Sequence, residues 1–133
     1  MKAKMAFIAL ALFAGQAKAE WAPIGQTHLF VVFLEKSTIR KQSGYTLMWA
    51  LNDYFKPYKE PKGDVYSSAK NLWVAKCEEY QIGLKTTTQF SGNMGNGEIV
   101  YQSPSQEFHQ IVFIDVEPGS VAEGTFNIMC GIK

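Results

Sequence analysis

The chain has 133 residues, a length that suits one compact domain and leaves no room for a second hydrophobic core. Its 13 lysines and arginines nearly balance 12 aspartates and glutamates, and no concentrated basic segment stands out. Because phosphate binding needs a basic face, the composition excludes a typical nucleic-acid-binding protein. We therefore expect a single domain with no nucleic-acid partner.

Residues 1–19 have the order of parts that is typical of a secretory signal peptide. Two lysines precede an apolar run, residues 5–14, that is too short to span a bilayer, and Ala17-Lys18-Ala19 matches a small-x-small cleavage site. The alternative, an N-terminal membrane anchor, needs a stop-transfer stretch, and none follows the run. We predict export with cleavage before Glu20, no membrane span, and a slightly acidic domain over residues 20–133.

The rest of the chain is organised as short extended segments separated by turn-forming residues. Apolar runs and period-two alternation predict six strands, at residues 27–35, 45–51, 65–77, 80–90, 98–102 and 108–116. The glycine-rich stretch 91–97 leads into an extended segment rather than a helix, so it indicates a turn and not a phosphate-binding loop. The pattern predicts a mainly β protein of the α+β class, with a single twisted antiparallel sheet of about six strands.

A polar segment, residues 52–63, interrupts the strands, because its two prolines cannot donate to a ladder. We expect a surface loop here. Its aromatic and basic residues are candidates for binding a protein partner: Tyr54, Phe55, Lys56, Tyr58 and Lys59. In the alternative interpretation, the aromatic side chains fold back as a lid on one end of the sheet and the lysines are solvated.

The C-terminal segment changes to helical spacing. Ser120 and Glu123 stand in the arrangement of a capping box, apolar residues recur at helical intervals from Val121, and Gly131 suits the position after a helix. This pattern predicts a short helix that ends at Cys130.

Cys77 and Cys130 are the only two cysteines of the sequence. In an exported chain a single pair predicts a disulfide, which would hold the C-terminal helix on the sheet. A reactive thiol is the weaker interpretation, because the sequence has no Cys-x-x-Cys motif and no histidine close to either cysteine.

Recognisable catalytic and metal-binding patterns are missing from the sequence. None of the serine-hydrolase, zinc-peptidase or calcium-loop motifs occurs. The two histidines, His28 and His109, stand in strand patterns, where half-buried sheet residues are more common than general bases. We expect a protein without enzymatic activity, cofactor or metal.

Several short motifs together resemble the surface-adhesin protein E family of Gram-negative bacteria. They are Ser37-Thr38-Ile39-Arg40, Met48-Trp49-Ala50-Leu51-Asn52-Asp53-Tyr54, Tyr66-Ser67-Ser68-Ala69-Lys70, Cys77, Gly92-Asn93-Met94-Gly95-Asn96-Gly97-Glu98-Ile99-Val100, Pro118-Gly119-Ser120 and Cys130-Gly131. Their order and the placement of the cysteines carry the resemblance. Lys76 departs from it, because an acidic residue is expected before the first cysteine.

The resemblance implies a twisted antiparallel sheet with a disulfide-bound helix, and binding rather than catalysis. It also implies attachment to host matrix or other extracellular proteins and the capacity to form a homodimer, which exposed sheet edges favour. The cleavage site has no cysteine, so no lipid anchor is predicted, and the exported chain is expected in the periplasm, the medium or at the cell surface. The alternative function is a soluble periplasmic or envelope-associated structural subunit.

Overall fold

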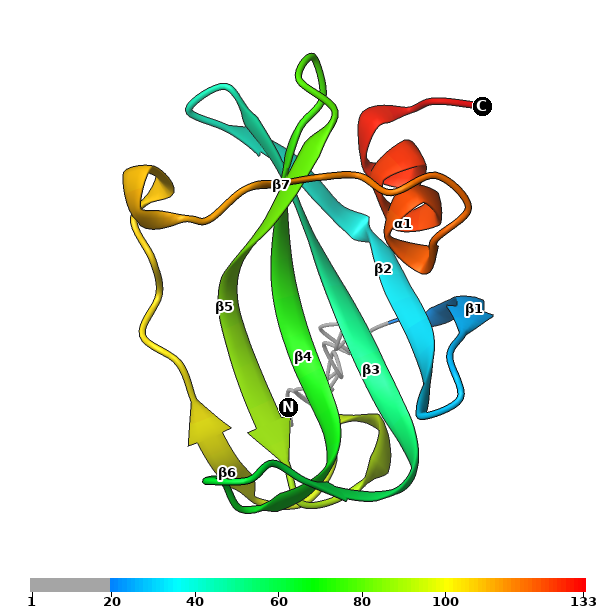
Figure 1. Ribbon diagram of the computed structural model, residues 1–133, viewed down its shortest axis with the longest axis vertical. Coiled ribbons are helices and arrows are strands. Elements are labelled where there is room, and N and C mark those ends of the chain that lie inside the picture. The colour runs from blue at the N-terminus through cyan, green and yellow to red at the C-terminus, as the bar shows by residue number, and fades with distance from the viewer. Residues whose placement is uncertain (1–19) are drawn as a thin grey trace, which may run out of the picture.

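The computed structural model describes residues 20–133, so the predicted signal peptide lies outside the described residues. One antiparallel sheet dominates the protein, and its strands follow one another in sequence order (Figure 1). They are β1 (Ala22–Gln26), β2 (Phe30–Gln42), β3 (Tyr45–Lys59), β4 (Val65–Lys76), β5 (Gln81–Phe90) and β6 (Ile99–Gln102), and the short β7 (Ile114–Asp115) pairs with β5. Two 3-10 turns, η1 (Asn93–Gly95) and η2 (Phe108–Gln110), and helix α1 (Val121–Cys130) complete the fold. The predicted fold class is confirmed.

The β2–β3 connection shows how local sequence sets the sheet. Ser43 and Gly44 lie at positive φ, 52° and 82°, between the paired residues Gln42 and Tyr45. Two residues of positive φ form a type I′ turn, whose twist matches that of the strands it joins. Strands β4, β5 and β6 likewise agree closely with the predicted ranges.

β3 runs on to Lys59, so the prediction of a surface loop is wrong for residues 52–59. The register with β4 breaks between Asp53 and Tyr58, where residues 54–57 lie opposite Ser67 alone. A bulge of this kind leaves extra residues outside the ladder, so the proline at position 57 costs no ladder hydrogen bond. The strand therefore continues past a residue that normally ends one.

The N-terminal end of the sheet also differs from the sequence pattern. β1 is not predicted, because its proline and glycine are poor strand formers. It forms as an edge strand on β2, with a register shift between Pro23 and Gly25. β2 begins at Phe30 rather than Thr27, because the Thr27 hydroxyl accepts the amides of Leu29 and Phe30 at 3.1 and 3.2 Å and closes a turn.

The predicted strand over residues 108–116 is wrong except for β7. The amides of Gln110 and Ile111 donate to carbonyls three residues earlier, which makes η2 a closed local turn. The segment after η2 lies against β5 at Gly83, where an added Cβ would stand 2.5 Å from Ile111 Cγ2 and 2.9 Å from the carbonyl oxygen of Val112. Residues 108–113 therefore cover a face of the sheet instead of extending its ladder.

Apolar side chains fill both faces of the sheet. On the face that α1 covers, the buried cluster comprises Val32, Leu34, Met48, Ala50, Ala75, Ile82, Val116, Phe126 and Met129. A second cluster contains Leu47, Leu72, Val74 and Ile111. The neighbours Leu47 and Met48 belong to different clusters, as expected for successive residues of a strand that is buried on both faces.

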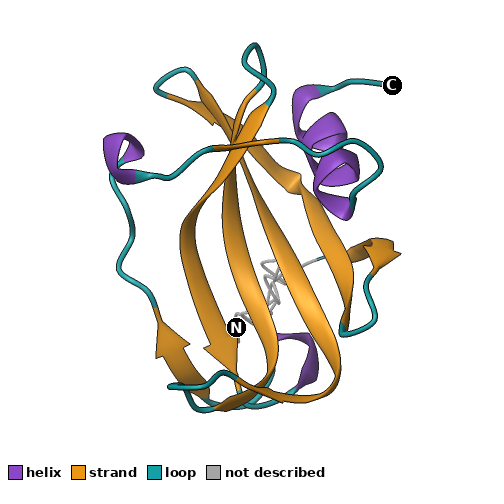
Figure 2. Ribbon diagram, in the orientation of Figure 1, coloured by secondary structure: helices purple, strands orange, loops and turns teal. Residues whose placement is uncertain are grey.

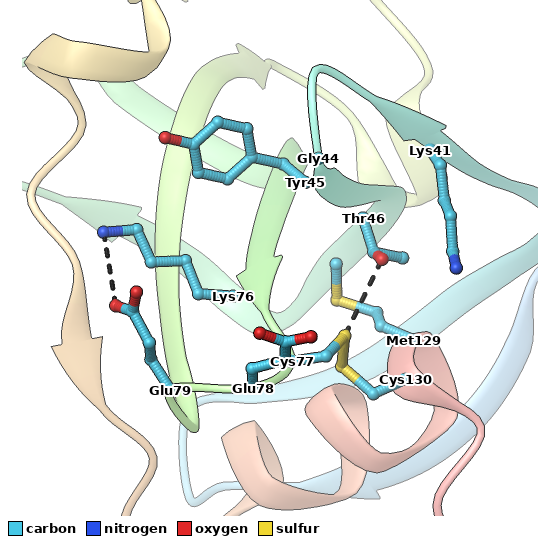
Figure 3. Close-up of a pocket in the computed structure, with 10 residues that line it drawn as sticks. All are labelled: Lys41, Gly44, Tyr45, Thr46, Lys76, Cys77, Glu78, Glu79, Met129 and Cys130. Carbon is cyan, nitrogen blue, oxygen red and sulfur yellow. Dashed lines mark hydrogen bonds and ion pairs between the residues drawn. A yellow bond between two sulfur atoms is a disulfide. The ribbon is translucent and has the colours of Figure 1, made fainter.

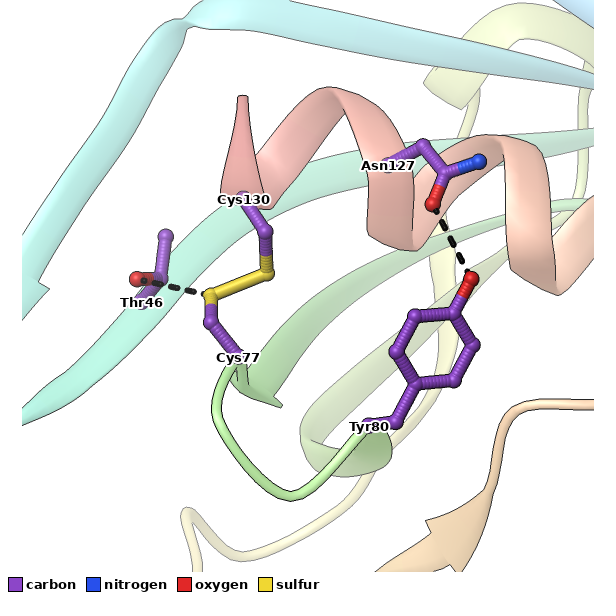
Figure 4. The surroundings of a disulfide bond; sticks show 5 residues. All are labelled: Thr46, Cys77, Tyr80, Asn127 and Cys130. Atoms are coloured by element: carbon purple, nitrogen blue, oxygen red, sulfur yellow. Dashed lines mark hydrogen bonds between the residues drawn. A yellow bond between two sulfur atoms is a disulfide. The ribbon is translucent and has the colours of Figure 1, made fainter. Parts of the chain in front are cut away.

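Helix α1 is capped and covalently attached. The Ser120 hydroxyl accepts the amide of Glu123 at 3.1 Å, and Gly131 has the left-handed φ of 66° that ends the helix. The Glu123 carboxylate accepts the amide of Gly119 at 3.3 Å. In a capping box it would accept the amide of the N-cap residue Ser120, so the predicted box is only half formed. The predicted disulfide is confirmed, with the Cα atoms of Cys77 and Cys130 5.7 Å apart (Figure 4).

Candidate protein-binding surface

Three tyrosines gather at the end of the sheet where β3 is bulged. The ring centroids of Tyr54 and Tyr66 lie 5.2 Å apart in an edge-to-face arrangement, and the Tyr58 ring lies 5.3 Å from that of Tyr54. Phe30 of β2 adds a fourth ring at 5.0 Å from Tyr54. The bulge produces this cluster, because it brings Tyr58 into register with Tyr66. Aromatic contacts of this geometry stabilise a fold by about 1 kcal/mol each beyond their burial.

A chain of hydrogen bonds joins the phenols to solvent. The Tyr54 and Tyr66 hydroxyls lie 3.4 Å apart, and the Tyr66 hydroxyl donates to Glu60 Oε1 at 3.1 Å. Burial is the main cause that raises the pKa of both Tyr54 and Tyr66 above the ordinary value of 10.0. Both phenols are therefore neutral hydrogen-bond donors at physiological pH.

The structure divides the predicted binding residues into two groups. Tyr54 is only 9% exposed and Tyr58 is half-buried, so both serve the aromatic cluster, as the lid interpretation expects. Phe55 is 57% exposed, and Lys56 and Lys59 are also exposed. The segment thus combines a packed aromatic layer with an outer layer of one aromatic and two basic side chains.

The backbone fixes the position of Phe55. Its amide donates to the carbonyl of Leu29 at 3.0 Å, which ties the bulged part of β3 to the turn before β2. Leu29 is itself exposed, so an apolar side chain from a second segment lies next to the Phe55 backbone. We call Leu29, Phe55, Lys56 and Lys59 the Phe55 surface.

A second feature of this end of the sheet is not apparent from the sequence. The Asp53 carboxylate accepts the amide of Met94 at 2.8 Å and the side-chain amide of Asn93 at 3.0 Å. The Ser68 hydroxyl accepts the amide of Gly95 at 2.9 Å and donates to the carbonyl of Gly92 at 2.6 Å. Three of the motifs that carry the family resemblance therefore meet in one hydrogen-bonded cluster that holds the 91–97 loop.

A hollow of about 560 Å³ lies at the opposite end of the sheet, beside the disulfide (Figure 3). Its lining includes Lys76 and Glu79, whose charged groups pair at 3.6 Å, and Thr46, whose hydroxyl lies 3.7 Å from Cys77 Sγ. The Lys76–Glu79 ion pair and the sulfur of Cys77, which is part of the disulfide, offer no free nucleophile.

Within residues 20–133 no three His, Cys, Asp or Glu side chains gather closely enough to hold a metal ion. His28 and His109 are exposed, so the expectation that they are half-buried in strands is wrong. In the described part of the chain, no helix is both long and apolar enough to cross a membrane.

The described fold defines a small β protein in which a disulfide secures the only α-helix of residues 20–133. The sequence model of the surface-adhesin protein E family matches residues 21–131, and the chain belongs to that family. No curated protein sequence matches the chain significantly.

Two solved structures show the same fold. Protein E of Haemophilus influenzae, in its selenomethionine form, superimposes with a TM-score of 0.57 at 14% identity, over 83% of this chain and 92% of that chain. Protein E from non-typeable Haemophilus influenzae superimposes with a TM-score of 0.58 at 13% identity, over 88% of this chain and 79% of that chain. At such low identity the likeness concerns the fold alone.

Proposed function

We propose that this chain is an exported, non-enzymatic protein-binding module that contacts an extracellular protein through the Phe55 surface. Its membership in a surface-adhesin family supports binding rather than catalysis. The exposure of Phe55 is the observation that carries the proposal, because the neighbouring tyrosines of the same strand are packed and this ring is not. Covering such a ring contributes about 2 kcal/mol to an association.

The charges around Phe55 suggest the nature of the partner. Lys76 and Glu79 form the only ion pair within residues 20–133, so Lys56 and Lys59 have no carboxylate partner there. Cations beside an exposed aromatic ring suit a protein surface that offers carboxylates around an apolar pocket. We therefore propose an acidic surface on an extracellular matrix or plasma protein as the binding partner.

Binding of the purified processed protein to immobilised matrix and plasma glycoproteins tests this proposal. Phe55→Ala should weaken capture at least tenfold and leave the melting temperature unchanged, because the side chain is exposed. Ile99→Ala is the matched control, since Ile99 is as exposed as Phe55 but lies on β6, which is not a neighbour of β3. Equal capture by Phe55→Ala and wild type would reject the Phe55 surface.

Tyr54→Ala separates recognition from packing. Because Tyr54 is buried in the aromatic cluster, its removal should lower the free energy of unfolding by about 3 kcal/mol or more. If Phe55→Ala behaves in the same way, losing stability and capture together, the lid interpretation applies to the whole segment.

Export is part of the same proposal. We propose cleavage before Glu20 without a lipid adduct, so the intact mass of the protein from its native host should correspond to residues 20–133. Fractionation of cells then distinguishes a surface or secreted adhesin from a periplasmic structural subunit. Sedimentation at high micromolar concentration tests the proposed homodimer, which a purely monomeric profile would reject.

A further inference from the structure

One long returning segment runs along the outer edge of β5, and Figure 2 shows it as strand, loop and a short helix before it crosses to α1. β6 pairs with the end of β5, and the amide of Gln106 then donates to the carbonyl of Lys85 at 3.0 Å. Further along, β7 pairs with the start of β5, and the amide of Val116 donates to the backbone carbonyl of Tyr80 at 3.1 Å. Apart from residues 108–113, which lie over a face of the sheet, the segment therefore forms an edge where alternate residues turn their backbone donors and acceptors outwards.

The part of this edge around β7 exposes aliphatic side chains in a regular pattern. Val112 is 80% exposed and Ile114 is 59% exposed, whereas Ile111 is buried and Phe113 packs against the cluster on the sheet face. Side chains two residues apart lie on the same side of an extended segment. Folding thus packs Ile111 and Phe113 inwards and leaves two aliphatic side chains exposed, Ile114 on the open edge of β7 and Val112 just before it, as at sites of strand addition.

This edge is held in place before any partner arrives. Phe113 and Phe108 both stack on Tyr45, with ring centroids 5.8 and 4.5 Å from it. Gly83 has no side chain, which lets the backbone of Val112 approach β5 closely. A rigid edge needs little ordering on binding, so less free energy is lost when a strand adds to it.

The charge of the segment indicates what kind of strand fits. Residues 86–132 contain no lysine or arginine, and they carry five carboxylates, at Glu98, Glu107, Asp115, Glu117 and Glu123. Two lysines approach from other strands, but Lys76 lies over the Phe113 ring at 4.2 Å and Lys85 donates to Ser105 and to the carbonyl of Gln106. Asp115 and Glu117 therefore face solvent without a cation, directly beside the exposed aliphatic pair.

We propose that β7, together with Val112 before it and Glu117 after it, is a docking edge for an extended segment of a partner protein that alternates apolar residues with lysine or arginine. The partner strand adds to the open edge of β7, its apolar side chains cover Val112 and Ile114, and its cations pair with Asp115 and Glu117. Symmetric pairing with a second copy is disfavoured, because it would bring two such acidic segments together. This site is distinct from the basic Phe55 surface and does not depend on its role.

A synthetic peptide of alternating valine and lysine, measured by fluorescence anisotropy with the purified protein, is the probe. Three control peptides complete the set: one with glutamate in place of lysine, one N-methylated on alternate residues, and one with lysines but scrambled order. We expect binding of the valine–lysine peptide only. The glutamate peptide has the wrong sign of charge, the N-methylated peptide lacks backbone donors, and the scrambled peptide lacks the alternation of apolar and basic residues. Equal binding of the N-methylated or scrambled peptide would mean simple charge attraction and would overturn the proposal.

Variants of the protein test where the peptide binds. Val112→Ser with Ile114→Ser should raise the dissociation constant at least tenfold without lowering the melting temperature, and Asp115→Asn with Glu117→Gln should reduce the salt dependence of binding. Phe55→Ala should bind the peptide as wild type does, which keeps this result separate from the function proposed above. Unchanged peptide affinity in the serine variant would reject the site. Self-association of the wild-type protein that the serine variant abolishes would also reject it, because the occupant of the edge would then be a second copy of the chain.

Discussion

The carboxylate of Asp53 accepts the backbone amide of Met94 at 2.8 Å, across 41 positions of the chain. Met94 has a φ of 55°, in the left-handed region that costs an ordinary residue roughly 1 kcal/mol. The hydrogen bond that the Met94 amide donates to Asp53 offsets this cost and holds η1 against the bulged end of β3. A motif in β3 and a glycine-rich loop therefore act as one structural unit.

Asp53→Ala should destabilise this unit. The substitution leaves the amide of Met94 and the side chain of Asn93 without their shared acceptor, which costs about 1–3 kcal/mol. Denaturant unfolding measures the loss, and hydrogen exchange should show faster exchange at Met94 and Gly95. Asp64→Ala is the control, because this exposed carboxylate makes no hydrogen bond within residues 20–133. Equal stability of the two variants would show that the loop is held by other contacts.

Breaking the disulfide should release α1 before the sheet unfolds. The bond closes a loop with a sequence separation of 53 residues, and its loss is expected to cost about 4 kcal/mol. In Cys130→Ala the short helix is then held on the sheet by its apolar face, chiefly Phe126 and Met129, and by the hydrogen bond that the Tyr80 hydroxyl donates to Asn127 at 3.4 Å. Hydrogen exchange should show lost protection over residues 121–130 while β3 and β4 stay protected. Uniform loss across sheet and helix would contradict this order.

Stability should fall at alkaline pH because of the tyrosine cluster. The folded-state pKa of Tyr66 is raised by burial, so folding favours the neutral phenol, and its contribution is complete below the unfolded pKa of 10.0. As pH rises above 10 towards the folded pKa, the unfolded state loses its proton first and stability declines, by at most about 1.4 kcal/mol per pH unit for each phenol. Denaturant unfolding between pH 8 and pH 11, in about half-unit steps, should show this decline, and Tyr66→Phe should make it shallower. An identical slope in the two proteins would exclude Tyr66 as the cause.

Two glycine-to-alanine substitutions should change the stability of the protein in opposite directions. Gly83→Ala should cost about 1–3 kcal/mol, because the new Cβ would stand 2.5 Å from Ile111 Cγ2 and 2.9 Å from a backbone oxygen. Gly124→Ala should stabilise by up to about 1 kcal/mol, since it lies inside α1 and its nearest neighbour, Ile24 Cδ1, is 4.0 Å away. Thermal unfolding of both variants checks the prediction. A tolerated Gly83→Ala would mean that the segment over β5 is loosely held.

Prediction from the sequence succeeded where the signal is local. β4 and β5 show apolar residues at strand spacing, and the helix has its serine cap and terminal glycine, so short windows contain the information needed. The disulfide followed from the predicted export together with the presence of a single pair of cysteines. The aromatic and basic content of residues 54–59 marked a segment of interest, although its conformation was predicted wrongly.

Failures occurred where a distant segment decides the local conformation. Pro57 ends a strand by any local rule, but a bulge opposite Ser67 keeps it inside β3. Residues 108–116 have the sequence pattern of a strand. However, Phe108 stacks on Tyr45, and the absence of a side chain at Gly83 lets the following residues pack over β5, so most of the segment covers a face of the sheet. Neither the position of Tyr45 nor that of Gly83 relative to this segment can be read from neighbouring residues.

By itself, therefore, the sequence determined the family, the class of fold, the capped helix and the pairing of Cys77 with Cys130. The tertiary structure decided which side chains of one segment are available, because burial depends on what the rest of the chain places above each residue. Tyr54 is enclosed by rings from β2 and β4, while Phe55, its neighbour, is left open. It also decided that Ile114 lies on an open edge with the exposed Val112 beside it, since only the pairing of β7 with β5 creates that edge.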